Sequence, residues 1–144
     1  MKIFTIGFTK KSAEQFFTRL KQPSLLRLVD ARLNNVSQLA GFTKKNDLKF
    51  FLREICNIDY VHLPELAPTQ EILDAYKKNG GNWSTYEKQF LALMATRRIE
   101  EKIDKNLIAG GCLLCSEATP EHCHRRLVAE YFREKWGDVD IHHL

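Results

Sequence analysis

The side chains best suited to chemistry in this sequence lie in one short segment, residues 115–125. The segment reads Cys-Ser-Glu-Ala-Thr-Pro-Glu-His-Cys-His-Arg, so thiols, imidazoles, carboxylates and a guanidinium are close together along the chain. A thiol beside an imidazole and a guanidinium carries more thiolate at neutral pH, which favours nucleophilic or redox chemistry. We therefore expect Cys123 or Cys115 to supply a thiolate and His124 to carry the proton.

The same segment has the signals of a helix start. Thr119 is placed as the N-cap and Pro120 as the first helical residue, which puts Cys123, His124 and Arg125 in the first turn and a half. Free N–H groups and the positive end of the helix dipole favour an anion there. We expect Arg125 and this helix start to bind an anionic group, with Cys123 and His124 facing the sheet.

Three other roles of these side chains stay open. Cys123 can pack as a small apolar side chain while His124 bonds a nearby carbonyl group. A redox disulfide between Cys115 and Cys123 is a second alternative, which ranks below a single reactive thiol. Zinc would need both cysteines together with His62 or His124, at a spacing outside the usual zinc pattern. We expect no cofactor, and zinc is the weaker alternative.

Polar side chains also lie at the ends of the other predicted strands. Asp30 and Arg32 end the second strand, His62 ends the third, Thr9 follows the first and Glu117 follows the fourth. Ligands bind beyond the carboxyl ends of the strands in open α/β sheets, so Arg32, His62 and Thr9 are expected to hold a substrate. His62 is also the alternative proton carrier. Asp30 or Glu117 would be the orienting carboxylate, and paired with a neighbouring arginine Asp30 would be structural instead.

The longest loop, residues 34–45, is rich in amide and hydroxyl groups and suits a recognition loop or a lid. Lysines and aromatic side chains in and around it can contact phosphates and stack on bases. They are Lys10, Lys11, Lys44, Lys45, Phe8, Phe42 and Trp83. For the aromatic residues, packing in the core is the alternative.

Predicted strands and helices alternate along the chain that positions these residues. β-branched, aromatic or near-continuous apolar runs predict strands at residues 2–8, 25–33, 58–63, 108–116 and 139–144. Helical spacing and capping signals predict helices at residues 12–21, 48–56, 69–78, 84–105 and 120–136. Ser12 with Gln15, and Ser84 with Glu87, are spaced as capping boxes.

This alternation indicates one α/β domain over residues 1–144. We expect three layers, with helices on both faces of a mostly parallel five-stranded sheet. Right-handed crossovers favour the Rossmann-like strand order 3-2-1-4-5, with the flavodoxin-like order 2-1-3-4-5 second. The apolar run at residues 108–116 suits a central strand that is covered on both faces.

The composition excludes several classes of protein. With 44% hydrophobic and 28% charged residues and only 7 Gly and 4 Pro, the chain is neither disordered nor collagen-like. Its apolar runs are far shorter than the roughly 20 residues that cross a bilayer, and no targeting signal is visible, so we expect a cytoplasmic protein without a membrane partner. The net charge of +4 mildly favours an anionic partner but lacks the dense basic footprint of a dedicated nucleic-acid binder.

Four short motifs are spread along the chain. They are Thr5-Ile6-Gly7, Leu28-Val29-Asp30-Ala31-Arg32, Tyr60-Val61-His62-Leu63-Pro64-Glu65-Leu66, and Leu113-Leu114-Cys115-Ser116-Glu117 with Pro120, Cys123, His124 and Arg125. In these motifs the chain resembles an uncharacterised bacterial and archaeal family, domain of unknown function 488. Many of its members have His and then Ser after the first Ile-Gly, where this chain has Phe8-Thr9. The resemblance implies an α/β fold and supplies no reaction or substrate.

These features favour a small enzyme that acts on a phosphate-bearing ligand, either a nucleotide or a nucleic acid. The competing hypothesis is a non-catalytic module that binds nucleic acid or protein through Lys44, Lys45 and the neighbouring aromatic residues. The sequence leaves the oligomeric state open.

Overall fold

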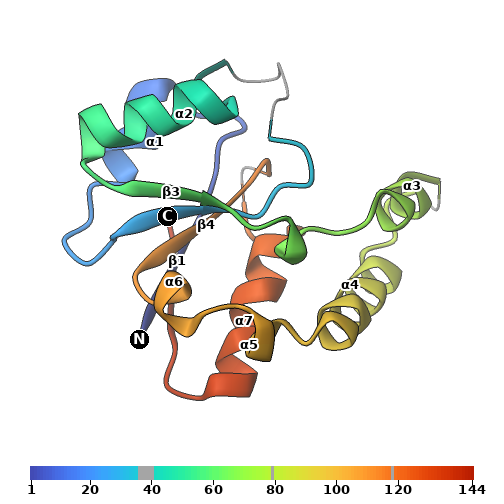
Figure 1. The fold of residues 1–144 in the computed structure, drawn as a ribbon. Coiled ribbons are helices and arrows are strands. Elements are labelled where there is room, and N and C mark those ends of the chain that lie inside the picture. The colour runs from blue at the N-terminus through green and yellow to red at the C-terminus, as the bar shows by residue number, and fades with distance from the viewer. Residues whose placement is uncertain (36–40, 79, 118) are drawn as a thin grey trace.

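The protein is built around one parallel sheet, seen in a computed structural model that describes residues 1–35, 41–78, 80–117 and 119–144. The strands are β1 (Lys2–Gly7), β2 (Arg27–Asp30), β3 (Asp59–His62), β4 (Gly111–Cys115) and β5 (Asp140–His143). They pair in the order β3-β2-β4-β1-β5, and all neighbours are parallel (Figure 1). The predicted α/β class with a parallel five-stranded sheet is confirmed, although β2 is shorter than the predicted run.

The strand order itself corrects the prediction of 3-2-1-4-5, and it is not 2-1-3-4-5 either. β4 lies between β2 and β1 and pairs with both. The connection from β1 to β2 leaves room for one strand between them in the sheet. The chain fills this position with β4, after it has formed β3. Every residue of β4 is buried, because this strand has neighbours on both edges and helices on both faces. The apolar run at residues 108–116 predicted this central position correctly, whereas the strand order predicted from right-handed crossovers was wrong.

Helices cover both faces of the sheet, which confirms the three layers (Figure 1). On one face α1 (Ala13–Arg19) and α2 (Lys45–Phe51), which continues as a π-helical turn η2 (Leu52–Cys56), pack through Phe16, Phe17, Leu48 and Leu52. On the other face α4 (Trp83–Arg97), α5 (Ile99–Lys102) and α7 (His124–Trp136) share a second apolar cluster. The remaining short elements are α3 (Gln70–Lys78), α6 (Lys105–Ile108), η1 (Gly41–Thr43) and η3 (Pro64–Leu66). Among the described residues, no helix is both long and apolar enough to cross a membrane.

Some helix boundaries follow the predicted caps and others do not. Ser12 and Gln15 form the predicted capping box of α1, and the Thr69 hydroxyl accepts a bond from the N–H of Ile72 at the start of α3. The predicted box of Ser84 with Glu87 is wrong. The N-cap of α4 is Asn82, whose side chain accepts from the N–H of Thr85.

The helix predicted to reach residue 105 ends earlier. α4 stops at Arg97 because Arg98 adopts the left-handed conformation, with φ of 52°. The turn lets a new helix, α5, start at Ile99, whose side chain is buried in the same apolar cluster.

The start of α7 is the largest local departure from the sequence prediction. Thr119 and Pro120 do not begin the helix, which starts four residues after Pro120, at His124. Residues 120–123 form a turn in which the N–H of Cys123 bonds the carbonyl of Pro120. Cys123 is the N-cap residue, with an extended backbone (φ −138°, ψ 139°) and no side-chain capping bond. This extended conformation turns the Cys123 side chain toward β4.

Candidate functional site

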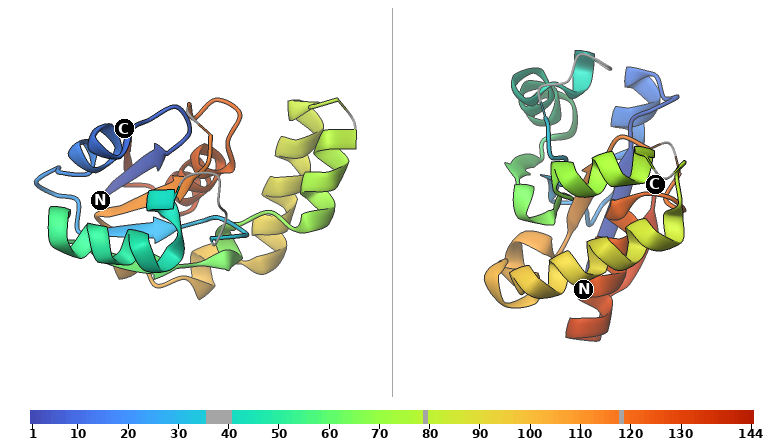
Figure 2. Two further views of the ribbon diagram at one scale, coloured as in Figure 1. Left: turned by 90° about the horizontal axis from the view of Figure 1, so that it is seen from above. Right: turned by 90° about the vertical axis from the view of Figure 1, so that its right-hand side faces the viewer.

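A cavity of about 450 Å³ opens beyond the carboxyl ends of the central strands. Its walls come from the segments after β1, β2 and β4, from the turn before α7, and from α3 and α4. Figure 2 shows α3 and α4 side by side beyond the strand ends, where they close one wall of this cavity. The residues that carry its chemistry are Arg32, Glu117, Cys123, His124, Trp83 and His122. This is the place that the strand-end rule predicts for a ligand.

Two cysteines meet at the base of the site. A disulfide joins Cys115, the last residue of β4, to Cys123, the N-cap residue of α7. The sequence ranked this disulfide below a single reactive thiol, and the structure brings the two sulfurs together. The reactivity of either thiol stays a prediction. Both cysteines are buried, with 1% of Cys115 and 2% of Cys123 exposed, but only Cys123 lines the cavity as far as the described residues show. The two sulfurs are therefore unequal in their access to a ligand.

Arg125 lies directly against both sulfurs. Its Nη1 is 3.3 Å from Sγ of Cys115 and 3.8 Å from Sγ of Cys123, and it donates to the carbonyl of Glu117 at 2.6 Å. The side chain is fully buried, and its Nε and Nη2 have no hydrogen-bond partner among the described residues. Burial lowers the pKa of Arg125 to about 10, so the guanidinium is still charged at neutral pH.

Arg125 takes part in no ion pair in the described part of the chain. The charge of Glu117 acts on it from a longer distance and partly offsets the effect of burial on its pKa. A buried charge without a close partner is costly, and among the described residues the two sulfurs are the polar side-chain atoms that the guanidinium contacts. A thiolate on either cysteine would neutralise it.

Gly7 makes room for this arrangement. A Cβ atom at Gly7, the last residue of β1, would lie 1.6 Å from the carbonyl oxygen of Glu117 and 2.5 Å from Nη1 of Arg125. Any other residue would displace either the loop after β4 or the guanidinium. The Thr5-Ile6-Gly7 motif is thus tied to the placement of Arg125.

His124 is the neutral imidazole of the site. Its Nε2 is 2.8 Å from the carbonyl of Ala31, and because a carbonyl only accepts, Nε2 carries the hydrogen and Nδ1 is left as an acceptor. Burial is the main cause that lowers the pKa of His124 to about 4. The ring is therefore uncharged at neutral pH and lines the cavity beside Cys123.

Asp30 and Arg32 form a buried ion pair at the end of β2. Arg32 donates two hydrogen bonds of 2.8 Å to the carboxylate of Asp30, and the hydroxyl of Tyr60 donates a third, of 2.6 Å. Asp30 is fully buried, and it does not line the cavity in the described part of the chain. The geometry therefore favours the structural alternative for Asp30. Burial raises the pKa of Tyr60, and the hydrogen bond to Asp30 raises it further.

Arg32 has a second role open to it, since it also lines the cavity. One of its nitrogens, Nη2, donates to the carbonyl of Thr43 at 2.6 Å, but Nη1 is buried without a partner among the described residues. Its guanidinium also lies 5.6 Å from the ring centre of Phe8. Arg32 thus keeps one donor group for a bound anion.

A group of stacked aromatic side chains also lines the cavity. Trp83 stacks on His122 with ring centres 5.0 Å apart, and on its other neighbour Tyr86 at the same distance. Tyr76 from α3 contacts both Trp83 and Tyr86. Of these four, the sequence singled out only Trp83. The helices α3 and α4 carried no recognisable motif, and only their packing beside the strand ends reveals this group.

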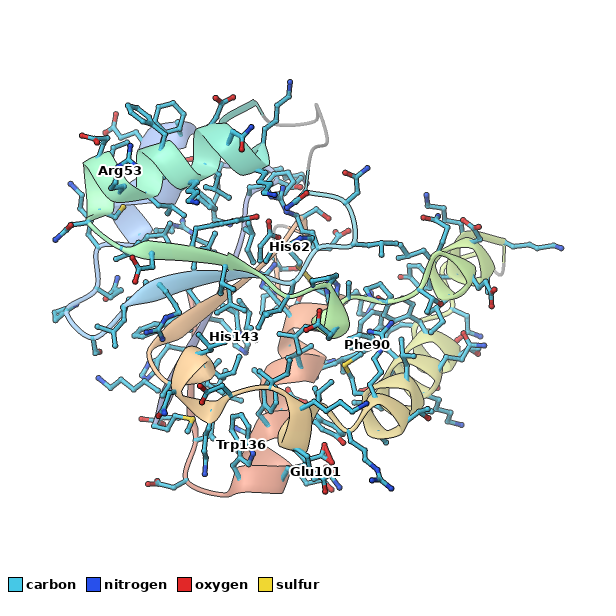
Figure 3. All side chains as sticks on the ribbon, in the orientation of Figure 1. Arg53, His62, Phe90, Glu101, Trp136 and His143 are labelled. Atoms are coloured by element: carbon cyan, nitrogen blue, oxygen red, sulfur yellow. A yellow bond between two sulfur atoms is a disulfide. The ribbon has the colours of Figure 1, made fainter. Side chains whose placement is uncertain are left out.

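The other predicted site residues have mixed positions. Glu117 is exposed and lines the cavity. His62 lies at the end of β3, where its Nε2 is 2.8 Å from the carbonyl of Arg32 (Figure 3). The Thr9 hydroxyl donates to the carbonyl of Ser116 and so ties the loops after β1 and β4 together. Lys44 is the N-cap residue of α2. Within the described ranges, His62, Thr9 and Lys44 are not part of the cavity wall.

The lid prediction for residues 34–45 is only partly covered, because residues 36–40 lie outside the described residues. Phe42 packs against Phe16 and Phe17 in the core, which is the alternative that the sequence left open for it. Phe8 is buried and also contributes to the cavity wall.

The zinc alternative has a suitable set of ligands. Ligand atoms of Cys115, Cys123 and His124 all lie within 4.8 Å of one another. A zinc ion with two thiolates is already neutral, so neither thiolate would be left to balance the guanidinium of Arg125. The same holds for the disulfide, so this charge does not decide between the two, and zinc stays an alternative.

Fold and site together define a class of protein: a parallel α/β sheet with a cysteine-arginine centre beneath a cavity at its carboxyl edge. Residues 12–132 match the family described as Domain of unknown function DUF488, and the chain belongs to this family. No curated protein and no solved structure matches the chain.

Proposed function

We propose that the protein is a small enzyme that binds a nucleotide-like ligand, with a flat ring and a phosphate group, and uses Cys123 as its nucleophile. The observation that carries the proposal is that one cavity is lined both by stacked aromatic rings and by Cys123, His124 and Arg32 with its unpartnered Nη1. A flat ring can stack on Trp83 or His122, and the phosphate can face Arg32.

The neighbouring groups supply the remaining chemistry. Arg125 stabilises a thiolate on Cys123 in the reduced protein, because a guanidinium favours the charged form of a contacting thiol. Neutral His124 takes or returns a proton through Nδ1. Exposed Lys77, which lines the rim of the cavity, adds attraction for an anion.

Ligand binding is tested through the fluorescence of Trp83. In a Trp136→Phe variant Trp83 is the only tryptophan, and Trp136 itself packs on Phe132 outside the cavity wall. We expect adenosine monophosphate to change the Trp83 emission in a saturable, salt-dependent way, and inorganic phosphate or adenosine alone to bind more weakly. Equal responses to phosphate and to the nucleotide, or no response to either, would contradict the proposed ligand class.

A matched pair of lysines supplies the control. Lys77→Ala should weaken nucleotide binding about two- to fivefold, the size expected for an exposed charge. Lys78→Ala should leave binding unchanged, because the neighbouring Lys78 is exposed and is not among the lining residues.

The nucleophile is tested by alkylation of the reduced protein with iodoacetamide at neutral pH. Cys123 should react about tenfold faster than free cysteine, because more of it is thiolate. Cys56, whose pKa is raised by burial, should react more slowly. A Cys123 rate no greater than that of free cysteine would remove the reactive-thiol part of the proposal.

The non-catalytic alternative makes the opposite prediction. If the protein is a binding module centred on Lys44 and Lys45, replacing both with Ala should weaken binding to nucleic acid and flatten its salt dependence. Cys123→Ser should then have no effect. Under the enzyme proposal, the two lysine changes leave the Trp83 titration as it is.

A further inference from the structure

We propose that Cys123 and Cys115 form a thiol–disulfide redox pair, in which Cys123 attacks a small disulfide substrate from the cavity and Cys115 resolves the mixed disulfide. The inference deepens the proposed function: it rests on Cys123 as the nucleophile and is independent of the nucleotide. It follows from the contact between the two sulfurs, from their unequal access to the cavity, and from the guanidinium shared between them.

The positions of the two cysteines divide the roles. Cys123 lines the cavity, so a substrate sulfur can approach its Sγ. Cys115 ends the fully buried strand β4, its sulfur contacts Cys123 and Arg125, and it does not line the cavity in the described part of the chain. An outer attacking thiol with an inner partner is the arrangement that two-cysteine exchange needs, because the inner thiol attacks only after the outer one is occupied.

The charge of Arg125 distinguishes a redox pair from a structural disulfide. In the disulfide form neither sulfur carries a charge, and the buried guanidinium has no ion-pair partner among the described residues, only the more distant charge of Glu117. In the reduced form one thiolate lies in direct contact with it. Reduction thus gives the buried charge a close partner, which favours the dithiol.

The contacts of Arg125 with both sulfurs match the sequence of steps. In the reduced protein Nη1 holds the thiolate of Cys123 while Cys115 is a thiol. Once Cys123 is occupied, the thiolate can pass to Cys115, which Nη1 contacts at 3.3 Å. A ring nitrogen of His124 lies within 4.8 Å of both sulfurs, so Nδ1 can relay the proton that leaves Cys115.

The reaction balances without any further group. The Cys123 thiolate attacks one sulfur of the substrate RSSR, the substrate S–S bond breaks, and the leaving RS⁻ takes the proton of Cys115 through His124. The Cys115 thiolate then attacks Sγ of Cys123 and releases the second RS⁻. The substrate gains two electrons and leaves as RSH and RS⁻, and the protein is left as the disulfide. A low-molecular-weight thiol regenerates the dithiol by the reverse exchange.

The test is a mass measurement on fully reduced protein mixed with hydroxyethyl disulfide and quenched with acid. Cys115→Ser should accumulate a mixed disulfide on Cys123, and Cys123→Ser should form none on Cys115. The parent protein should proceed to the Cys115–Cys123 disulfide, and the double change of Cys56 and Cys112 to Ser should behave like the parent. A mixed disulfide on Cys115 or Cys56, or a parent protein that stops at the mixed disulfide, would overturn the redox pair.

A second measurement needs no substitution in the site. The unaltered protein is equilibrated in buffers of varied ratio of reduced to oxidised glutathione, and its free thiols are then alkylated and mapped. Cys115 and Cys123 should oxidise together within the accessible range while Cys56 and Cys112 stay reduced. A pair that stays fully oxidised at every ratio is a structural disulfide, and one that never oxidises is no redox pair; either result overturns the inference.

The two proposals can fail separately. If the Trp83 fluorescence does not respond to nucleotides but disulfide exchange is intact, the nucleotide ligand is excluded and the redox pair is retained. Fast alkylation of Cys123 without resolution by Cys115 removes the redox pair and leaves the nucleophile.

Discussion

Two buried arginines stand at the carboxyl edge of the sheet, and their charges are balanced in different ways. Arg32 after β2 is held by the carboxylate of Asp30 in a two-pronged ion pair, with Tyr60 as a further donor. Arg125 in α7 is held by a carbonyl and two sulfurs and has no carboxylate partner in the described part of the chain.

The difference separates a structural ion pair, Asp30–Arg32, from a centre around Arg125 whose charge depends on the redox state of two cysteines. The Asp30–Arg32 pair holds the end of β2 in place, because each charge has its partner within the pair. The counter-charge of Arg125 depends on whether Cys115 and Cys123 are reduced. His62 and His124 link the two regions to the same backbone, since they bond the carbonyls of Arg32 and Ala31.

The largest effect on stability is expected at the Asp30–Arg32 pair. Asp30→Asn removes the counter-charge of a buried guanidinium and should lower the free energy of unfolding by about 3–5 kcal/mol. Urea denaturation measures this value. Asp59→Asn, at an exposed position on the neighbouring strand β3, is the control and should change stability little. If Asp30→Asn also changes stability little, Asp30 does not balance the charge of Arg32, and the two arginines do not differ in this respect.

The next effect concerns the space around Arg125. Gly7→Ala places a Cβ against the carbonyl of Glu117 and against Nη1, so it should lower stability by about 3 kcal/mol and slow the alkylation of reduced Cys123. The matched control is Gly41→Ala, whose added Cβ would meet no atom within 4 Å. If the Cys123 rate stays unchanged although stability falls, Arg125 does not activate this thiol.

His124, which joins both regions, should make stability depend on pH. Its folded pKa of about 4 is below its ordinary 6.5, so the unfolded chain binds a proton that the folded protein does not. The contribution is complete above pH 6.5 and is lost as the pH falls toward about 4, amounting to about 3 kcal/mol. Denaturation curves of the parent and His124→Gln should differ in slope across this range. Parallel curves would show that His124 is protonated as readily in the folded protein.

The smallest effect on stability is expected for Tyr60, whose hydroxyl donates a hydrogen bond to Asp30. Tyr60→Phe removes the hydroxyl that donates to Asp30 and should cost about 2 kcal/mol in the same urea assay. In the Asp30→Asn background the cost should shrink, because the charged acceptor is gone. Full additivity of the two changes would show that the hydroxyl and the carboxylate are not coupled.

Features with a local cause could be predicted from the sequence. The capping box of Ser12 and Gln15 is confirmed, as is the central place of β4. Of the two helices predicted between β3 and β4, the first is α3, whereas the second is divided into α4 and α5. The strand order could not be derived in this way, because it depends on which strand fills the gap left by an earlier crossover. The start of α7 was wrong because Thr119 and Pro120 are good capping residues, yet Cys123 must be extended for its sulfur to meet Cys115.

The candidate site shows the same division. Strand-end reasoning identified Arg32, Glu117, Cys123 and His124, which do line one cavity. It placed Lys44 and Thr9 there as well, but Lys44 starts α2 and Thr9 ties two loops together. Tyr76 and His122 were missed as lining residues, because only the packing of α3 and α4 beside the strand ends brings their rings to the cavity.

By itself, the sequence determined the parallel α/β class and the elements that bring thiol, imidazole and guanidinium groups to one edge, because periodicity and strand ends are properties of neighbouring residues. Only the tertiary structure decided that Arg125 would be buried without a carboxylate and against two sulfurs, while Arg32 found Asp30. The physical reason is that the charge balance of a buried group depends on everything packed around it, and in this fold those neighbours come from four separate strands and loops.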